Sequence, residues 1–283
     1  MASEWLELHT PPALPGLILQ AALRRDIRGT SLPRRGLRCP VEVDAAHLAR
    51  YRSLCGFRDT GQLPATYPHL LAFPLQMQLL GDPEFPFPTL GLVHLENRIR
   101  VVRPLTGSGP LSLSLEANNL LPHDKGAVFS VITRLEDSLG LLWEADSRLL
   151  CRGVQLDGQV AERSEAANLP REQIARWRAG ASIGRRYARV SGDWNPIHLS
   201  ALSARLFGFP RAIAHGLWNK GKTLAALHDH LPAAGYSIEV RFQKPVLLPG
   251  DVRLMASRPA ATGQFELLGT DAMPHMSGHW QVI

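Results

Sequence analysis

The distribution of apolar and polar residues predicts a buried helix followed by a series of strands, and this order occurs twice along the chain. Residues 63–80 form an apolar segment with the length and composition of a mostly buried helix, in which Pro74 marks a start or a kink. Strand-like segments follow it, separated by breaks that contain Gly and Asp, at 90–105, 111–117, 127–135 and 141–150. A helix followed by an antiparallel meander predicts an α+β fold.

The first forty residues are less regular and rich in Pro and Arg. Residues 17–23 suggest a short helix, and residues 41–43 a short strand. Asp44 is a suitable N-cap for a helix that reaches Cys55, and Gly56 is a suitable stop.

The same order of elements returns after a polar stretch without periodicity, residues 153–170. A strand at 173–179, a short helix that Ser182 can cap and a longer helix from Gly216 precede further strand-like segments. Those segments are 236–248, 252–259, 264–269 and 275–282. Residues 99–105 also resemble 240–248, and 67–76 occupy the place of 213–222. We therefore expect a duplicated unit, with domains at 1–152 and 171–283 joined by a linker at 153–170.

Charge and composition narrow the range of partners. Lys and Arg number 31 against 25 Asp and Glu, a formal net charge of +6, which favours anionic partners. The basic residues are scattered without an interleaved aromatic stripe, so we do not expect nucleic-acid binding. No apolar run is long enough for a membrane span, and the first ten residues lack the basic start of a signal peptide. Three cysteines without paired spacing fit a reducing cytoplasm.

Reactive side chains gather in one stretch, residues 187–216. Asp193, Asn195 and His198 lie within six residues of one another. With His198 in the first turn of a helix and Asp193 in the loop before it, both side chains can face one cleft. A carboxylate and an imidazole can divide the work of activating a water and moving a proton at a neighbouring carbon. A helix start favours neutral imidazole and a nearby carboxylate favours imidazolium, so the charge state of His198 stays open.

Two helices are expected around these residues. Asn195 before Pro196 predicts a helix start, and an N-cap role alone could explain Asn195. Leu199, Leu202 and Leu206 would form the apolar stripe of this helix, which Gly208 would end. The second helix starts at Gly216, whose backbone N–H is a suitable donor to a thioester oxygen that gains enolate character. Its expected buried face comprises Leu217, Gly221, Leu224, Leu227 and Leu231.

Other interpretations stand beside this one. His215 can be a packing or hydrogen-bonding residue, and Asp193 can be a turn residue. Asp193, His198 and His215 could ligate a metal, but their spacing matches no compact zinc pattern, so we expect no metal. Ser191 and Cys151 are nominal nucleophiles outside any recognised signature.

The sequence also resembles a known family. YARVSGDWNPIH followed by GFPRAIAHG, and VRFQKPVLLPGD at 240–251, resemble the MaoC-like dehydratases, the (R)-specific enoyl-CoA hydratases of hotdog fold. In the first half, LPATYPHLLAFP, FPFPTLG and HLENRI resemble bacterial 3-hydroxyacyl-thioester dehydratases with two fused hotdog domains. The resemblance spans most of the chain and is weakest before residue 40 and across the linker.

The resemblance implies a double hotdog fold, in which each domain wraps an antiparallel sheet around one long helix. It assigns water activation and proton handling to Asp193 and His198, orientation of the site to Asn195, and an oxyanion contact to the Gly216 amide. Some relatives place a serine on the central helix, but the region around Leu224 offers none. The first domain lacks the motif and, by the same resemblance, is expected to house the acyl chain.

The resemblance also implies the substrate. We expect interconversion of a trans-2-enoyl thioester and an (R)-3-hydroxyacyl thioester of coenzyme A or acyl carrier protein in fatty-acid metabolism, without a metal or redox cofactor. Arg241 and Lys244 are candidates to meet the carrier's phosphate, although solvated surface charge would explain them equally. Arg211 and His215 are further candidates for substrate contact. A non-catalytic acyl-thioester binder and an acyl thioesterase are the alternatives, and a homodimer stays open.

Overall fold

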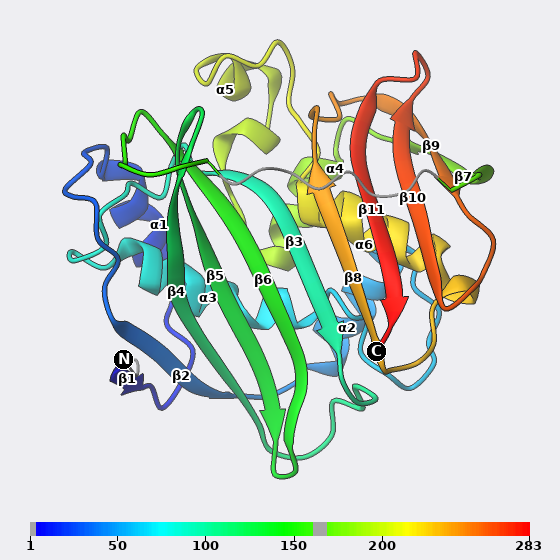
Figure 1. Ribbon diagram of the computed structural model, residues 1–283, viewed down its shortest axis with the longest axis horizontal. Coiled ribbons are helices and arrows are strands. Elements are labelled where there is room, and N and C mark those ends of the chain that lie inside the picture. The colour runs from blue at the N-terminus through cyan, green and yellow to red at the C-terminus, as the bar shows by residue number, and fades with distance from the viewer. Residues whose placement is uncertain (1–3, 161–168) are drawn as a thin grey trace.

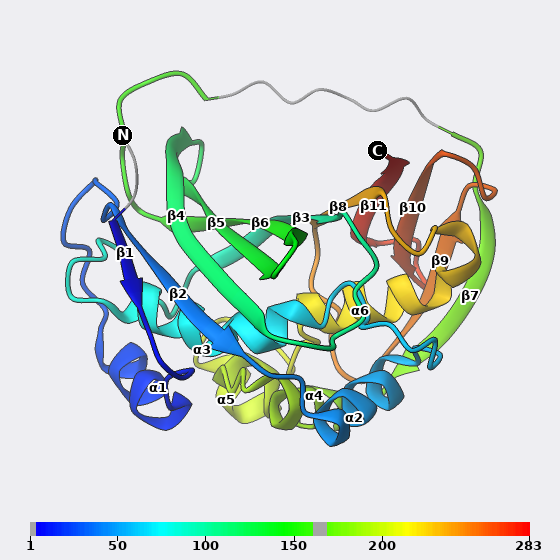
Figure 2. The same cartoon turned by 90° about the horizontal axis from the view of Figure 1, so that it is seen from below.

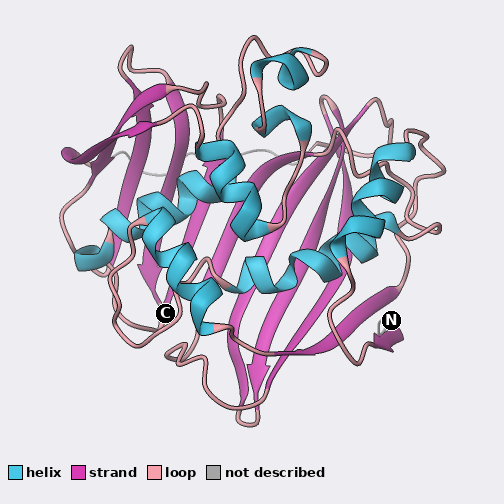
Figure 3. Ribbon diagram, turned by 180° about the vertical axis from the view of Figure 1, so that it is seen from behind, coloured by secondary structure: helices cyan, strands magenta, loops and turns pink. Residues whose placement is uncertain are grey.

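The computed structural model describes residues 4–160 and 169–283. Within these residues, eleven strands form one curved sheet in the order β1-β2-β4-β5-β6-β3-β8-β11-β10-β9-β7 (Figure 1). The helices lie on the concave side of the sheet, where α3 and α6 run one after the other across it (Figure 2). Seen from behind, they cover the middle of the sheet (Figure 3). The predicted α+β class is confirmed.

The elements of the first half precede the expected linker. They are β1 Glu4–Glu7, α1 Leu14–Leu23, β2 Arg35–Val41, α2 Ala45–Cys55, α3 Pro68–Gly81, β3 Val93–Val101, β4 Leu111–His123, β5 Gly126–Asp137 and β6 Gly140–Arg152. The second half follows. It comprises β7 Glu172–Ala179, α4 Ile183–Ser191, the 3₁₀ helix η1 Pro196–His198, α5 Ala201–Arg205, α6 Gly216–Ala226, the 3₁₀ helix η2 His228–His230, β8 Tyr236–Phe242, β9 Gly250–Ala256, β10 Thr262–Gly269 and β11 Pro274–Val282.

The two halves have the same topology. The first half carries one extra strand at its outer edge, β1, which pairs parallel with β2. Apart from β1, the first half reads β2-β4-β5-β6-β3 from its outer side, and the second reads β7-β9-β10-β11-β8. In each half, the strands of this series lie in the sheet in the order first, third, fourth, fifth and second, counted along the chain. The halves meet where β3 pairs antiparallel with β8, with Asn97 opposite Val240 and Ile99 opposite Ile238. This is the double hotdog arrangement. Residues 161–168 of the expected linker lie outside the described residues, so the limits 1–152, 153–170 and 171–283 stay predictions.

Local signals in the sequence explain several helix ends. The Asp44 carboxylate accepts hydrogen bonds from the backbone N–H groups of Ala46, at 2.8 Å, and His47, at 3.2 Å, and so caps α2. Gly56 ends α2 in the left-handed conformation, with φ of 82°. Pro68 begins α3, and Pro74 lies inside that helix.

The core is continuous across both halves. Trp143 of β6 is fully buried, and its indole N–H donates to the backbone oxygen of Ala65 at 2.7 Å. Trp280 of β11 occupies the corresponding strand of the second half and is 1% exposed. Burial of such side chains stabilises the fold by about 1.5–3 kcal/mol each. The sheet therefore gives the helices a rigid surface to pack on.

Several expected elements differ in extent from the observed ones: the strand expected at 41–43 is β2 at Arg35–Val41, and the strand expected at 90–105 is β3 at Val93–Val101. The segment expected as one strand at 236–248 ends at Phe242, because Pro245 and Pro249 cannot donate to a sheet ladder. The following residues turn back toward the start of α6, where the Ala214 N–H donates to the Val246 oxygen at 2.9 Å. The region after β8 is thus tied to the segment that leads into Gly216.

The helix expected from Asn195 to Gly208 is also shorter than predicted. Ser200 adopts an extended conformation and accepts from the Ser203 N–H at 3.1 Å, which separates η1 from α5. The expected apolar stripe is wrong, because Leu202 is 77% exposed and Leu206 is 82% exposed. These two leucines therefore do not belong to the hydrophobic core of the chain.

Candidate active site

The loop between α4 and η1 carries Asp193. Gly192 ends α4 in the left-handed conformation, with φ of 79°, and directs the chain away from the helix. The Asp193 N–H donates to Ser191 Oγ at 3.2 Å, and Asp193 Oδ1 accepts from the Asn195 N–H at 3.1 Å. The Asp193 side chain is 34% exposed. One carboxylate oxygen is therefore fixed by the loop, and the group stays accessible to a ligand.

Asn195 has the cap role that the sequence predicted. Its Oδ1 accepts from the Ile197 N–H at 3.3 Å at the start of η1. This cap places His198 one turn later, in the position that the spacing predicted. The further role of Asn195 in orienting the site stays a prediction.

The ring of His198 has a defined tautomer. Its Nδ1 lies 2.9 Å from the Ile213 oxygen, and because a carbonyl only accepts, Nδ1 carries the hydrogen and Nε2 a lone pair. The residue is 7% exposed. Burial lowers the pKa of His198, although the Asp193 charge and the hydrogen bond to Ile213 oppose the shift. Neutral imidazole is thus the favoured form, which answers the question that the sequence left open.

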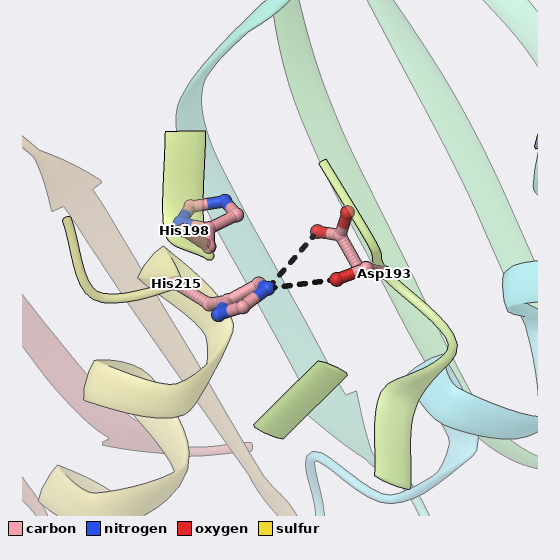
Figure 4. Close-up of side chains that lie close together, drawn as sticks. All are labelled: Asp193, His198 and His215. Carbon is pink, nitrogen blue, oxygen red and sulfur yellow. Dashed lines mark hydrogen bonds and ion pairs between the residues drawn. The ribbon is translucent and has the colours of Figure 1, made fainter. Parts of the chain in front are cut away.

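His215 joins the two candidate catalytic residues (Figure 4). Its Nε2 donates to the backbone oxygen of Asp193 at 3.0 Å and lies 3.7 Å from Asp193 Oδ2. Its ring stacks on the ring of His198, with centroids 3.6 Å apart and an interplanar angle of 23°. Burial and the neighbouring His198 lower the pKa of His215 to about 3, so this ring is neutral near pH 7. The packing and hydrogen-bonding interpretation describes these contacts, and substrate contact by His215 stays a prediction.

The same three side chains are the metal candidates. Among the described residues, Asp193, His198 and His215 are such a group, with ligand atoms within 4.8 Å of one another. However, the His215 nitrogen that faces Asp193 already carries the hydrogen given to the Asp193 oxygen. These donors suit proton transfer better than metal coordination.

Gly216 begins α6, and its neighbour Phe242 limits the space there. His215 occupies the N-cap position without a side-chain hydrogen bond to the helix, so no side chain caps the amides of the first turn. A Cβ atom on Gly216 would lie 3.0 Å from the Phe242 ring. The Phe242 ring in turn contacts His94 of β3, with centroids 5.0 Å apart. The absence of a side chain at Gly216 therefore leaves beside its amide the space that a Cβ atom would take from a ligand oxygen.

Residues of the first half also border the site, and sequence reasoning missed them. A Cβ atom on Gly192 would lie 2.4 Å from a Leu14 methyl carbon and 3.3 Å from the Phe73 ring. His47 of α2 lies 2.7 Å through Nε2 from the Val190 oxygen of α4, and 2.8 Å through Nδ1 from the Tyr67 hydroxyl. The contacts of Gly192 with Leu14 and Phe73, and of His47 with Val190, join residues more than one hundred positions apart in the chain, so no local pattern could reveal them.

A buried lysine links α6 to the first half. Lys220 is 0% exposed, and its Nζ donates to the backbone oxygen of Asn97 at 2.9 Å and to Asn97 Oδ1 at 2.5 Å. The Asn97 amide then donates to Ser147 Oγ at 3.0 Å and contacts His69 Nε2 at 3.2 Å. Burial holds the pKa of Lys220 well below its ordinary value, and only Glu239 opposes this shift. The network fixes the helix that carries Gly216 against β3.

Comparisons with known proteins place the chain in a family. Residues 170–268 match the family described as MaoC like domain. The 3-hydroxyacyl-thioester dehydratase X of Mycobacterium tuberculosis is 34% identical over 249 residues, which are 86% of this chain and 88% of that protein. The chain belongs to the MaoC-like dehydratases. The resemblance read from the central motif is therefore confirmed.

Two further similarities support the same conclusion for this MaoC-like protein. The crystal structure of HtdX from M. tuberculosis superposes with a TM-score of 0.75 at 30% identity and covers 87% of this chain and 100% of that one. Peroxisomal enoyl-CoA hydratase 2 of Arabidopsis thaliana is 27% identical over 213 residues, 69% of this chain and 68% of that protein. A solved structure from M. tuberculosis that is described as a double hotdog fold superposes with a TM-score of 0.52 at 12% identity and covers 92% of this chain and 96% of that one, which confirms the double hotdog fold.

The basic residues that are expected to contact the carrier's phosphate differ in exposure and in the partners that they already have. The Nε of Arg241 already pairs with Glu96 Oε1 at 3.2 Å, and Arg148 pairs with the other oxygen of that carboxylate at 2.8 Å. Lys244 is exposed, as is Arg211, which donates to the Pro249 oxygen at 3.2 Å. Phosphate binding by Arg241, Lys244 and Arg211 stays a prediction, and Arg241 has the strongest competing partner.

A cavity of about 340 Å³ lies at the opposite end of α6 from Gly216. It is lined by Leu224 of α6, by His228 just after that helix and by residues around Leu63 of the first half. Neither Asp193 nor His198 lines it. The candidate site is therefore defined by its side chains and not by this cavity.

Across residues 4–160 and 169–283, no helix of the MaoC-like chain is long and apolar enough to cross a membrane.

Proposed function

We propose that the chain is a hydro-lyase that interconverts a trans-2-enoyl thioester and an (R)-3-hydroxyacyl thioester in fatty-acid metabolism. One observation carries the proposal: the accessible carboxylate of Asp193 and the neutral ring of His198 lie together beside the start of α6. The names of the relatives, a 3-hydroxyacyl-thioester dehydratase and an enoyl-CoA hydratase, support the same reaction class.

In the hydration direction, the oxygen of a water adds to C3 of the enoyl group. Asp193 and the lone pair on His198 Nε2 hold this water and take its proton. The electrons of the C2–C3 double bond move toward the thioester oxygen, which then accepts the Gly216 N–H as it gains charge. Proton delivery to C2 completes the addition of one water and restores the protonation state of the pair.

The substrate contacts form a second part of the proposal. Asn195 keeps Asp193 and His198 in register, and Arg241, Lys244, Arg211 and His215 remain the proposed residues around the carrier end of the thioester. In this proposal, the first half houses the acyl chain. The position of Leu14 and Phe73 beside Gly192, the residue before Asp193, supports this role. The reaction needs no redox cofactor, and the three buried, unpaired thiols fit the proposed cytoplasmic location.

Two variants test the site assignment. Asp193→Asn and His198→Ala should each lower kcat/KM on short and medium trans-2-enoyl-CoA substrates by about 10²–10⁴-fold, the usual contribution of a positioned acid or base. Asp229→Asn and His228→Ala are matched controls, because they change an exposed acid and an exposed imidazole beyond the other end of α6. Unchanged turnover in both site variants would refute the assignment.

The same assay separates the alternatives. An acyl thioesterase would release free thiol from the enoyl thioester, whereas a hydratase leaves the thioester intact. A non-catalytic binder would bind enoyl-CoA of some chain length without consuming its double bond. Formation of the (R)-3-hydroxyacyl thioester, identified by chiral separation, is the expected result.

A further inference from the structure

The segment from Ser182 to Arg211 carries an unusual charge. It contains five arginines and one acid, Asp193, so it contributes +4 of the formal net charge of +6. All five arginines are exposed. They are Arg185, Arg186, Arg189, Arg205 and Arg211. The surface around the candidate site thus holds most of the uncompensated positive charge of the chain.

Exposed leucines lie among these arginines. Leu202 is 77% exposed and Leu206 is 82% exposed. They are four residues apart, so they lie on one face of the α5 region, next to Arg205. Trp194, which follows Asp193 directly, is 41% exposed. Large apolar side chains that cluster on a soluble surface commonly mark a site of interaction.

The α5 region is fixed to the rest of the site rather than loosely attached. Ser203 Oγ donates to the Pro196 oxygen at 2.7 Å, and Arg185 of α4 donates to the Leu199 oxygen at 2.7 Å. Gly184 packs so closely on the His198 carbonyl that a Cβ atom there would collide with it. The leucines therefore stand at a defined place relative to His198.

This surface lies at the end of the molecule where the reacting groups are. In Figure 1, α5 stands beyond the arrowhead end of β8, and Phe242 at that end contacts Gly216. Leu202 follows His198 by four residues, so their Cα atoms are at most about 14 Å apart. A macromolecule bound to α5 would therefore hold an attached thioester close to Asp193 and His198.

We propose that Arg185, Arg189, Leu202, Arg205 and Leu206 form a docking surface for an acidic acyl carrier protein. The inference rests on the proposed hydratase function and names the carrier of its substrate. Coenzyme A offers phosphates for arginines but no apolar surface of its own to cover two leucines on a projecting helix. An acidic protein helix with an apolar edge complements both the arginines and the leucines. Its phosphopantetheine arm would reach the site from there.

Kinetics on two carriers of one acyl group test the proposal. The substrate is (2E)-octenoyl on a freestanding bacterial acyl carrier protein or on coenzyme A. Arg205→Glu and the double variant Leu202→Ser with Leu206→Ser should lower kcat/KM on the carrier-protein substrate by about tenfold or more. Both should stay within twofold of wild type on the coenzyme A substrate, and added salt should selectively weaken turnover of the carrier-protein substrate.

Matched controls use residues of similar exposure elsewhere. Leu139→Ser changes a leucine that is 82% exposed in the turn between β5 and β6, and Arg258→Glu reverses an exposed charge beyond β9. Neither should separate the two carriers. Equal losses on both carriers in the α5 variants, or no loss on either, would overturn the docking surface.

Two other outcomes also have a definite meaning. If wild type hydrates octenoyl-CoA but not the carrier-protein substrate, the docking proposal fails and the hydratase function stands. If wild type turns over neither substrate, the proposed function itself fails. Loss of sedimentation with anionic phospholipid vesicles in the α5 variants, with carrier kinetics unchanged, would assign the surface to membranes and overturn the proposal.

Discussion

Replacement of His215 by phenylalanine should weaken catalysis through Asp193 and His198. The phenyl ring can keep the stacking on His198 that the imidazole makes at 3.6 Å. It removes the N–H that donates to the Asp193 oxygen at 3.0 Å. The substitution therefore isolates one hydrogen bond that positions the carboxylate.

The size of the effect follows from that lost bond. A carbonyl left without a partner in this partly buried loop costs about 1–3 kcal/mol, or the loop moves to find another donor. In either case Asp193 is less often in the geometry for reaction. If the full cost appears in the transition state, kcat/KM falls by about 5- to 150-fold, at 1.4 kcal/mol per factor of ten.

Steady-state hydration of (2E)-octenoyl-CoA, with kcat and KM separated, measures the effect. Because the pKa of His215 is about 3, the ring is neutral across the assay range, so the pH profile should keep its shape while its height falls. His69→Phe is the matched control: it removes a buried histidine at the start of α3, whose pKa is also about 3. A folded His215→Phe variant with kcat/KM within twofold of wild type would refute the reasoning.

Three further perturbations have defined outcomes. The pKa values of His69 and His215 are about 3, against about 6.5 unfolded, so below pH 6.5 the unfolded chain binds protons that the folded one does not. Acidification from pH 7 to pH 5 should therefore lower the free energy of unfolding by about 2 kcal/mol for each residue, as urea titrations would measure; equal stability at both pH values would contradict it. Because the folded pKa of Lys220 is depressed, the unfolding free energy should rise from pH 7 toward 10, by up to about 1.4 kcal/mol per pH unit. Lys220→Met should remove that rise, and a slope equal to that of wild type in the same titrations would show that Lys220 is not its source. Gly216→Ala, with its Cβ atom 3.0 Å from Phe242, should lower kcat on octenoyl-CoA by about tenfold while urea titration shows a stability change below about 1 kcal/mol; unchanged kcat would remove Gly216 from the oxyanion contact.

Local rules in the sequence predicted the elements whose cause is local. Asp44 and Gly56 delimit α2 because capping needs only a side chain and a few neighbouring amides. The spacing of Asp193, Asn195 and His198 likewise predicted a loop, a cap and an imidazole one turn later. The repeated order of helices and strands predicted the duplicated topology, since strand pairing follows the order of hairpins.

Contacts between distant residues were not predictable. The apolar stripe on Leu202 and Leu206 was wrong because periodicity shows which residues share a face but not what covers that face. The burial of Lys220 has no signal in the neighbouring residues, because it depends on Asn97, 123 residues earlier. The stacking of His198 on His215 depends on contacts of the segment between α5 and α6, where the Ile213 oxygen accepts from His198 Nδ1 and the Ala214 N–H donates to the Val246 oxygen, and no spacing encodes these contacts.

The pairing of β3 with β8 has a consequence for how the chain can change over generations. In a pair of identical subunits, every substitution appears twice, so a residue that adapts the wall around a substrate also alters the copy that performs chemistry. Here the two copies share one sheet but are written separately in the sequence. Under the proposed roles, substitutions at Leu14 and Phe73 would change the wall around the acyl chain while Asp193 and His198 stay the same. A fused pair of this kind would let one half adapt while the other keeps the reaction.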